Sequence, residues 1–149
     1  MKIKEELYNA CQAFVAEKRS NVHDIMLSNQ TALENESKSS AGDKHETGRA
    51  MLHLEMEKAS QQIAVVDKMQ EVMEKIDFSK TSDHVKLGSL IITDSGNYYL
   101  SISAGLIRIG NEDYFAISPS SPIGNLFLGK IKGSMIHLSE KQIHILDVQ

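Results

Sequence analysis

The feature that most constrains the fold is a run of 36 residues, 2–37, that contains neither proline nor glycine. Because these two residues are the usual helix breakers, the run predicts one long helix. A second stretch, 44–76, contains no proline and a single glycine, Gly48, and predicts a second long helix. Apolar residues recur in both stretches mostly at steps of three, four and their sums, the spacing of one helix face. They are Ile3, Leu7, Cys11, Phe14, Val22, Ile25, Ala32 and Leu33 in the first stretch, and Met51, Leu54, Ile63, Val66, Met69, Met73 and Ile76 in the second.

The two predicted helices are separated by small polar residues and one glycine at 37–42, a composition typical of turns. Each helix would be about 50 Å long at 1.5 Å per residue. Too few apolar residues remain on their other faces to bury them in a globule. We therefore expect a monomeric antiparallel two-helix coiled coil over 1–78, with a parallel dimer of one continuous helix as the alternative.

Two carboxylates lie where the second helix is expected to start. Asp43 and Glu46 are three residues apart, so they share one helix face. One interpretation is a capping box, in which both side chains only satisfy free backbone N–H groups. The other is a pair of metal ligands presented at an exposed tip, 41–47. The two interpretations are compatible.

The period changes after a polar linker at 77–83. Runs rich in β-branched and aromatic residues at 85–93, 98–103, 106–109, 114–117, 134–138 and 142–148 predict strands, and 123–128 predicts a short helix. Turn residues at 94–97 and 110–113 favour hairpins. The fold class is therefore α+β, with a small, mostly antiparallel β domain at 79–149 following the helices.

Composition excludes several classes of function. The net charge is −4 over 149 residues, and neither half is the basic field expected of an autonomous nucleic-acid binder. Cys11 is the only cysteine, so we expect a structural thiol in a reducing compartment. No apolar run is long enough to span a membrane, which favours a cytoplasmic location. No nucleophile–base pair or phosphate-binding glycine loop indicates an independent enzyme.

Two motifs resemble a known family. Gly42-Asp43-Lys44-His45-Glu46 resembles the tip of the bacterial Gre transcript-cleavage factors, and the segment 121–130, Ser-Pro-Ile-Gly-Asn-Leu-Phe-Leu-Gly-Lys, resembles part of their C-terminal FKBP-like domain. The segment 85–89, Val-Lys-Leu-Gly-Ser, is similar to the opening strand of that domain. The order and spacing of these segments extend the resemblance over nearly the whole chain.

The resemblance implies a function and a partner. Gre factors dock on RNA polymerase and pass the coiled coil through its secondary channel, where they stimulate cleavage of backtracked transcripts. By this resemblance Asp43 and Glu46 would help hold Mg²⁺ shared with the polymerase, near the nascent RNA 3′ end. Ser121, Pro122 and Gly124 would be surface residues that dock on the polymerase, whereas Leu126 and Phe127 would pack in the core.

Differences from the family leave other functions open. Thr47-Gly48 follows the tip, whereas the family commonly has asparagine after the tip glutamate. Residues 104–109, Ala-Gly-Leu-Ile-Arg-Ile, replace an acidic loop. The alternatives are a regulator of the same fold that occupies the channel without stimulating cleavage, and a structural coiled-coil adaptor.

Overall fold

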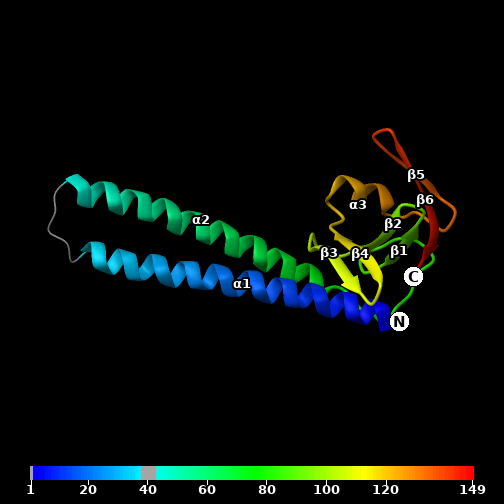
Figure 1. Ribbon diagram of the computed structural model, residues 1–149, viewed down its shortest axis with the longest axis horizontal. Helices are drawn as coiled ribbons and strands as arrows, with labels where there is room; N and C mark the ends of the chain where they lie inside the picture. Colours follow the sequence, from blue (N-terminus) through cyan, green and yellow to red (C-terminus); the bar gives the residue numbers. More distant parts are fainter. Residues whose placement is uncertain (1, 38–42) are drawn as a thin grey trace. The chain divides into compact units, whose positions relative to one another are not determined.

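The computed structural model describes residues 2–37 and 43–149, without the side chains of Ser37 and residues 43–46. Three helices are seen in this part of the chain: α1 (Lys2–Ser37), α2 (Asp43–Glu74) and α3 (Pro122–Phe127) (Figure 1). The predicted first helix is confirmed over its full length. The second ends before Ile76, because the last amides bond three residues back instead of four: Lys75 N–H to Val72 O and Ile76 N–H to Met73 O. Such bonds tighten and end a helix.

The chain divides into two compact units. One, the helical unit, is Val15–Met69; the other, the sheet unit, combines the chain up to Phe14 with Gln70–Gln149. The predicted division at residue 78 followed the polar linker. In the structure, the first turns of α1 and the end of α2 group instead with the sheet. The reason is that their buried side chains, such as Leu7 and Met73, are part of that unit's interior.

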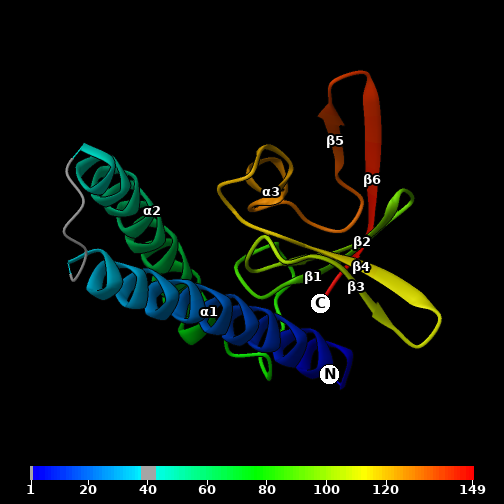
Figure 2. The ribbon, with the colours of Figure 1, turned by 60° about the vertical axis from the view of Figure 1, so that its left-hand side comes forward.

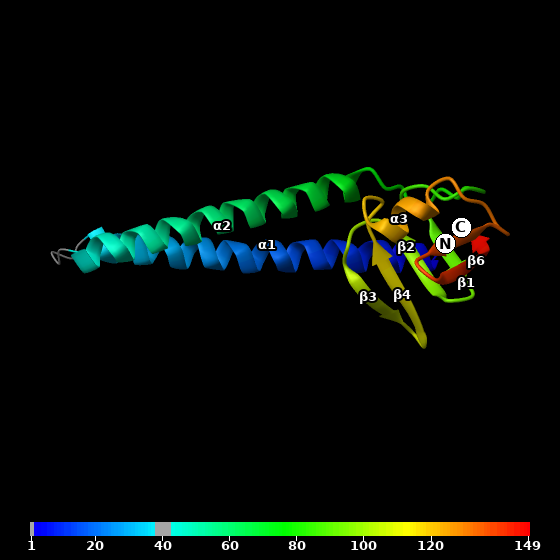
Figure 3. The same ribbon diagram turned by 90° about the horizontal axis from the view of Figure 1, so that it is seen from above.

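In the helical unit, α1 and α2 lie side by side and run antiparallel (Figure 3). The Arg19 guanidinium forms an ion pair with Asp67, at 2.8 Å, and the Glu36 carboxylate lies against Gly48. Later residues of α1 therefore contact earlier residues of α2. The helices form the expected intrachain hairpin.

The contact face of α2 agrees with the predicted one at Ile63, Val66 and Met69 and differs from it nearer the start of the helix. The buried and half-buried residues of α2 in the helical unit recur at steps of four and three, and are Gly48, Leu52, Met56, Ala59, Ile63, Val66 and Met69. Met51 and Leu54, which we expected on this face, are 64% and 66% exposed. That expectation is wrong. The apolar residues at 51 and 54 and those at 52 and 56 both have helical spacing, so the sequence is compatible with two different contact faces. The partner helix selects one of them.

The sheet unit contains a six-stranded mixed sheet of order β3-β4-β2-β1-β6-β5. The strands are β1 (Leu90–Thr93), β2 (Gly96–Leu100), β3 (Gly105–Ile109), β4 (Glu112–Ile117), β5 (Met135–Leu138) and β6 (Lys141–Val148). The predicted hairpins are confirmed as β1–β2 and β3–β4, and β5–β6 forms another (Figure 2). Only β2 and β4 pair in parallel among these strands.

The first strand is shorter than predicted because a turn precedes it. Gly88 has φ +90°, and Ser89 N–H bonds to Lys86 O at 3.0 Å. A positive φ costs little only in glycine, so this residue breaks the extended run that its apolar neighbours favour. Strand β1 begins two residues later, at Leu90.

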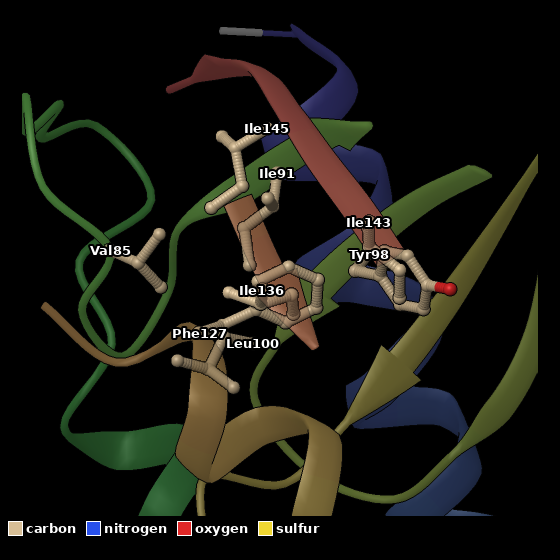
Figure 4. Close-up of a cluster of buried hydrophobic side chains, with 8 residues drawn as sticks. All are labelled: Val85, Ile91, Tyr98, Leu100, Phe127, Ile136, Ile143 and Ile145. Atoms are coloured by element: carbon tan, nitrogen blue, oxygen red, sulfur yellow. The ribbon is translucent and has the colours of Figure 1, made fainter. Parts of the chain in front are cut away.

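Apolar side chains cover both faces of the sheet. One face holds a core cluster, to which β1, β2, β5, β6 and α3 contribute (Figure 4): Val85, Ile91, Tyr98, Leu100, Phe127, Ile136, Ile143 and Ile145. The residues Leu90 of β1 and Tyr99 of β2 lie on the second face of the sheet and are also buried. Next to that second face, Cys11 Sγ of α1 lies 3.5 Å from Ser101 Oγ. The first turns of α1 thus complete the sheet unit.

Candidate functional site

The predicted metal ligands lie at the beginning of α2. Asp43 is the first residue of this helix, and Glu46 follows in its first turn. Three residues of helical backbone place both residues on one side of the helix, and carboxylates interact favourably with a helix N-terminus. Residues 41 and 42 of the predicted tip, and the side chains of Asp43 and Glu46, lie outside the described part. Their metal-binding role therefore stays a prediction.

A third carboxylate close to this helix start was missed by the sequence analysis. A Cβ atom added at Gly48 would overlap Oε1 of Glu36, on the facing helix. Glycine at position 48 therefore makes room for the Glu36 carboxylate, within one and a half turns of Asp43. Gly48, although glycine is a weak helix former, therefore has a packing role in the hairpin. The sequence alone does not predict this contact, because it depends on which turns of the two antiparallel helices face each other.

The second predicted site is the segment that enters α3. Ser121 is the N-cap of this helix: its hydroxyl accepts a hydrogen bond from Gly124 N–H at 3.1 Å and donates one to Ser118 O at 2.6 Å. Pro122 follows at the first helical position, where its missing N–H has no cost. Pro122 is exposed and Ser121 half-buried, so both reach the surface.

Gly124 does not lie on the surface, contrary to our expectation. It is buried, and a Cβ atom there would overlap the carbonyl oxygen of Ser118. The Ser121 hydroxyl bonds both to Ser118 O and to Gly124 N–H, and so holds the Ser118 backbone close to α3. This close approach leaves no room for a Cβ atom at position 124. The predicted packing of Phe127 is confirmed, because its side chain is fully buried in the core cluster, with Leu126 packed against the cluster. Docking on a polymerase through Ser121 and Pro122 stays a prediction.

The thiol of Cys11 fits the structural role that we expected. It is fully buried beside the Ser101 hydroxyl. Burial raises the pKa of this thiol, which disfavours the reactive thiolate.

The start of α2 offers a metal ion two carboxylates, those of Asp43 and Glu46. Across the residues whose side chains are described, no three His, Cys, Asp or Glu side chains come together as a metal site. Two carboxylates on one helix turn are suitable ligands for Mg²⁺, which takes oxygen ligands and retains several waters. They would form only part of a coordination sphere. A partner would have to supply the rest.

No protein-family model matches the chain, and a search of curated proteins finds no match either. Within the described chain, every helix is too short or too polar to cross a membrane.

Proposed function

We propose that this protein is an RNA polymerase accessory factor of the Gre type. It enters the secondary channel of the enzyme with its helical hairpin and stimulates Mg²⁺-dependent cleavage of backtracked transcripts. In this role it is not an enzyme by itself, and it uses the polymerase's own nuclease activity. The finer description of the fold, a coiled coil followed by an FKBP-like domain, belongs to this proposal.

The observation that carries the proposal is the position of the acidic pair relative to the hairpin. The two long helices run antiparallel, and Asp43 and Glu46 lie in the first turn of α2, next to the chain reversal. The residues that most need to meet a partner are therefore at the end of the hairpin. A role confined to capping would not require a hairpin of this length.

Asp43 and Glu46 would act as additional ligands at a metal centre that the polymerase holds incompletely. When bound, Mg²⁺ supplies charge stabilisation and activation of water for phosphodiester hydrolysis. The two carboxylates would bind the ion and orient the attacking water through a hydrogen bond. The sheet unit would dock on the polymerase through Ser121 and Pro122. Contact with the nascent RNA 3′ end would occur only inside the complex.

The test uses the full chain and a stalled, backtracked bacterial elongation complex. Asp43→Asn and Glu46→Gln remove the charges but keep the size and hydrogen-bonding capacity of a cap. We expect both variants to bind polymerase and to lose most of the stimulated cleavage, with partial recovery in excess Mg²⁺. Glu57→Gln, an exposed charge change on the same helix, is the matched control and should retain cleavage.

Three outcomes would overturn the proposal. Full cleavage by a folded, polymerase-bound Asp43→Asn/Glu46→Gln double variant would leave only the capping role. Binding of the wild-type chain without any cleavage would favour the regulator that only occupies the channel. Absence of polymerase binding would favour the remaining alternative, a structural coiled-coil adaptor.

Docking is tested separately with Pro122→Glu. This residue is exposed, so the fold should survive and polymerase affinity should fall. Ile131→Glu places the same charge at another exposed apolar position in the sheet unit and serves as the control. Equal losses in the two variants would show that Pro122 has no special docking role.

A further inference from the structure

A lysine-rich cleft lies within the sheet unit, and the sequence analysis did not anticipate it. It has a volume of about 300 Å³ and is formed by three segments: the first turn of α1, the chain leaving α2, and the turn before β1. Its lining is Lys4, Lys75, Asp77, Lys80, Ser82, Lys86, Leu87, Gly88 and Ser89. Four lysines and one aspartate therefore line one small cleft, which gives its lining residues a surplus of three positive charges.

Lys4 is the buried member of this group. It is 3% exposed, and its ammonium donates a hydrogen bond to the backbone oxygen of Lys80 at 2.6 Å. An ammonium group has three donors, so one acceptor leaves donor capacity in the cleft. Burial, and next the charge of Lys86, lower the pKa of Lys4. The protein thus holds a lysine in a place where its positive charge is unfavourable, and the charge of Asp77 offsets this only in part.

The acidic residue of the lining, Asp77, offsets only part of these charges. The Asp77 carboxylate accepts hydrogen bonds from the N–H and the hydroxyl of Ser79, in its own loop. These bonds lower the pKa of Asp77 and keep it ionised. Within the part of the chain that the structure describes, none of the four lysines forms an ion pair with a carboxylate. The charge surplus is a property of the folded cleft.

We propose that this cleft binds a diphosphate group, either inorganic pyrophosphate or the diphosphate end of a nucleotide. Lysine ammonium groups are flexible point charges with three donors each, and they commonly bind phosphate oxygens in proteins. One phosphate carries about 1.5 to 2 negative charges at neutral pH. Two linked phosphates match the surplus of three positive charges more closely. The lining contains no aromatic side chain to stack a base, so the phosphates are the recognised part.

The test is calorimetric titration of the full chain with sodium pyrophosphate in magnesium-free buffer of low ionic strength. Lys80→Gln and Lys86→Gln change exposed side chains, so both variants should fold. We expect each to weaken pyrophosphate binding about threefold to tenfold, and the double variant to weaken it further. Lys132→Gln removes an exposed charge outside the cleft and should leave the affinity unchanged.

Other ligands define the specificity and the source of the diphosphate. A nucleoside diphosphate that binds as tightly as pyrophosphate, or more tightly, would identify a nucleotide, and weaker binding would identify the free anion. The proposal is overturned if pyrophosphate does not bind, if orthophosphate binds equally well, or if Lys132→Gln weakens binding as much as Lys86→Gln. The inference is independent of the polymerase role, because the titration requires no polymerase.

Discussion

The helical unit and the sheet unit bury their apolar residues in very different ways. Of the 21 buried hydrophobic residues in the described chain, four lie in the helical unit: Val15, Val22, Ala59 and Val66. The other 17 belong to the sheet unit, which is covered on both faces. A helix satisfies its backbone hydrogen bonds internally, so a hairpin needs only a narrow apolar contact. A sheet of short strands depends on tertiary packing, and its residues are therefore less replaceable.

In each unit a glycine makes room for a neighbouring group, but the two neighbours differ in how easily they can move. Gly48 in the helical unit faces the end of a flexible side chain, that of Glu36, whereas Gly124 in the sheet unit faces the backbone oxygen of Ser118. A side chain can rotate away from a new methyl group, and a backbone carbonyl fixed by hydrogen bonds cannot. The same substitution should consequently have opposite effects in the two places.

The largest effect should come from the core of the sheet unit. Phe127 is fully buried, and its ring centroid lies 5.1 Å from that of Tyr98. Phe127→Ala should lower the free energy of unfolding by about 3–5 kcal/mol, because it leaves a cavity. Urea denaturation followed by circular dichroism measures the change. Val66→Ala in the helical unit is the comparison and should cost less, since only about two methylene equivalents are removed. Equal losses would contradict the contrast between the units.

Gly124→Ala should have the next largest effect. The new methyl group would overlap Ser118 O and displace the backbone that leads into α3. We expect a loss of about 1–3 kcal/mol, as for other overpacked sites. Thermal unfolding measures it. A variant as stable as the wild type would show that the Ser118 segment can move, and that this part of the sheet unit is not tightly packed.

Gly48→Ala should act in the opposite direction. Alanine is a better helix former than glycine by about 1 kcal/mol, and the Glu36 carboxylate can rotate away. We expect the free energy of unfolding to rise by up to about 1 kcal/mol, in the same thermal assay. Destabilisation would mean that the position of Glu36 matters more than helix propensity. The variant Glu36→Gln/Gly48→Ala would then separate the two contributions.

The smallest effect should come from the ion pair of the helical unit. Arg19 and Asp67 are both substantially exposed, with side-chain exposures of 41% and 58%, so water and salt screen their interaction. A double-mutant cycle with Arg19→Gln and Asp67→Asn should give a coupling free energy of about 0.2–1 kcal/mol. The coupling should fall as NaCl is added. A larger, salt-independent coupling would indicate that this pair defines the register of the hairpin.

Local signals in the sequence determined the elements of this protein. The run without proline or glycine predicts α1 from Lys2 to Ser37, and the turn residues at 94–97 and 110–113 predict two of the hairpins. The apolar residues at 123–128 predict α3, which the structure places one residue earlier, at Pro122–Phe127. These predictions succeeded because each depends on interactions between residues close together in the chain. The acidic pair at the beginning of α2 was also visible in this way, although its role awaits the cleavage experiment.

Only the tertiary structure decided which surfaces of these elements meet. It selected Leu52 and Met56 over Met51 and Leu54, paired β2 in parallel with β4, and buried Gly124 beneath Ser118. It also placed Lys4 and Lys86, which are 82 residues apart in the sequence, in one cleft. The physical reason is the same in every case. Periodicity specifies a face but not its partner, and the charge of a cavity exists only after distant segments have come together.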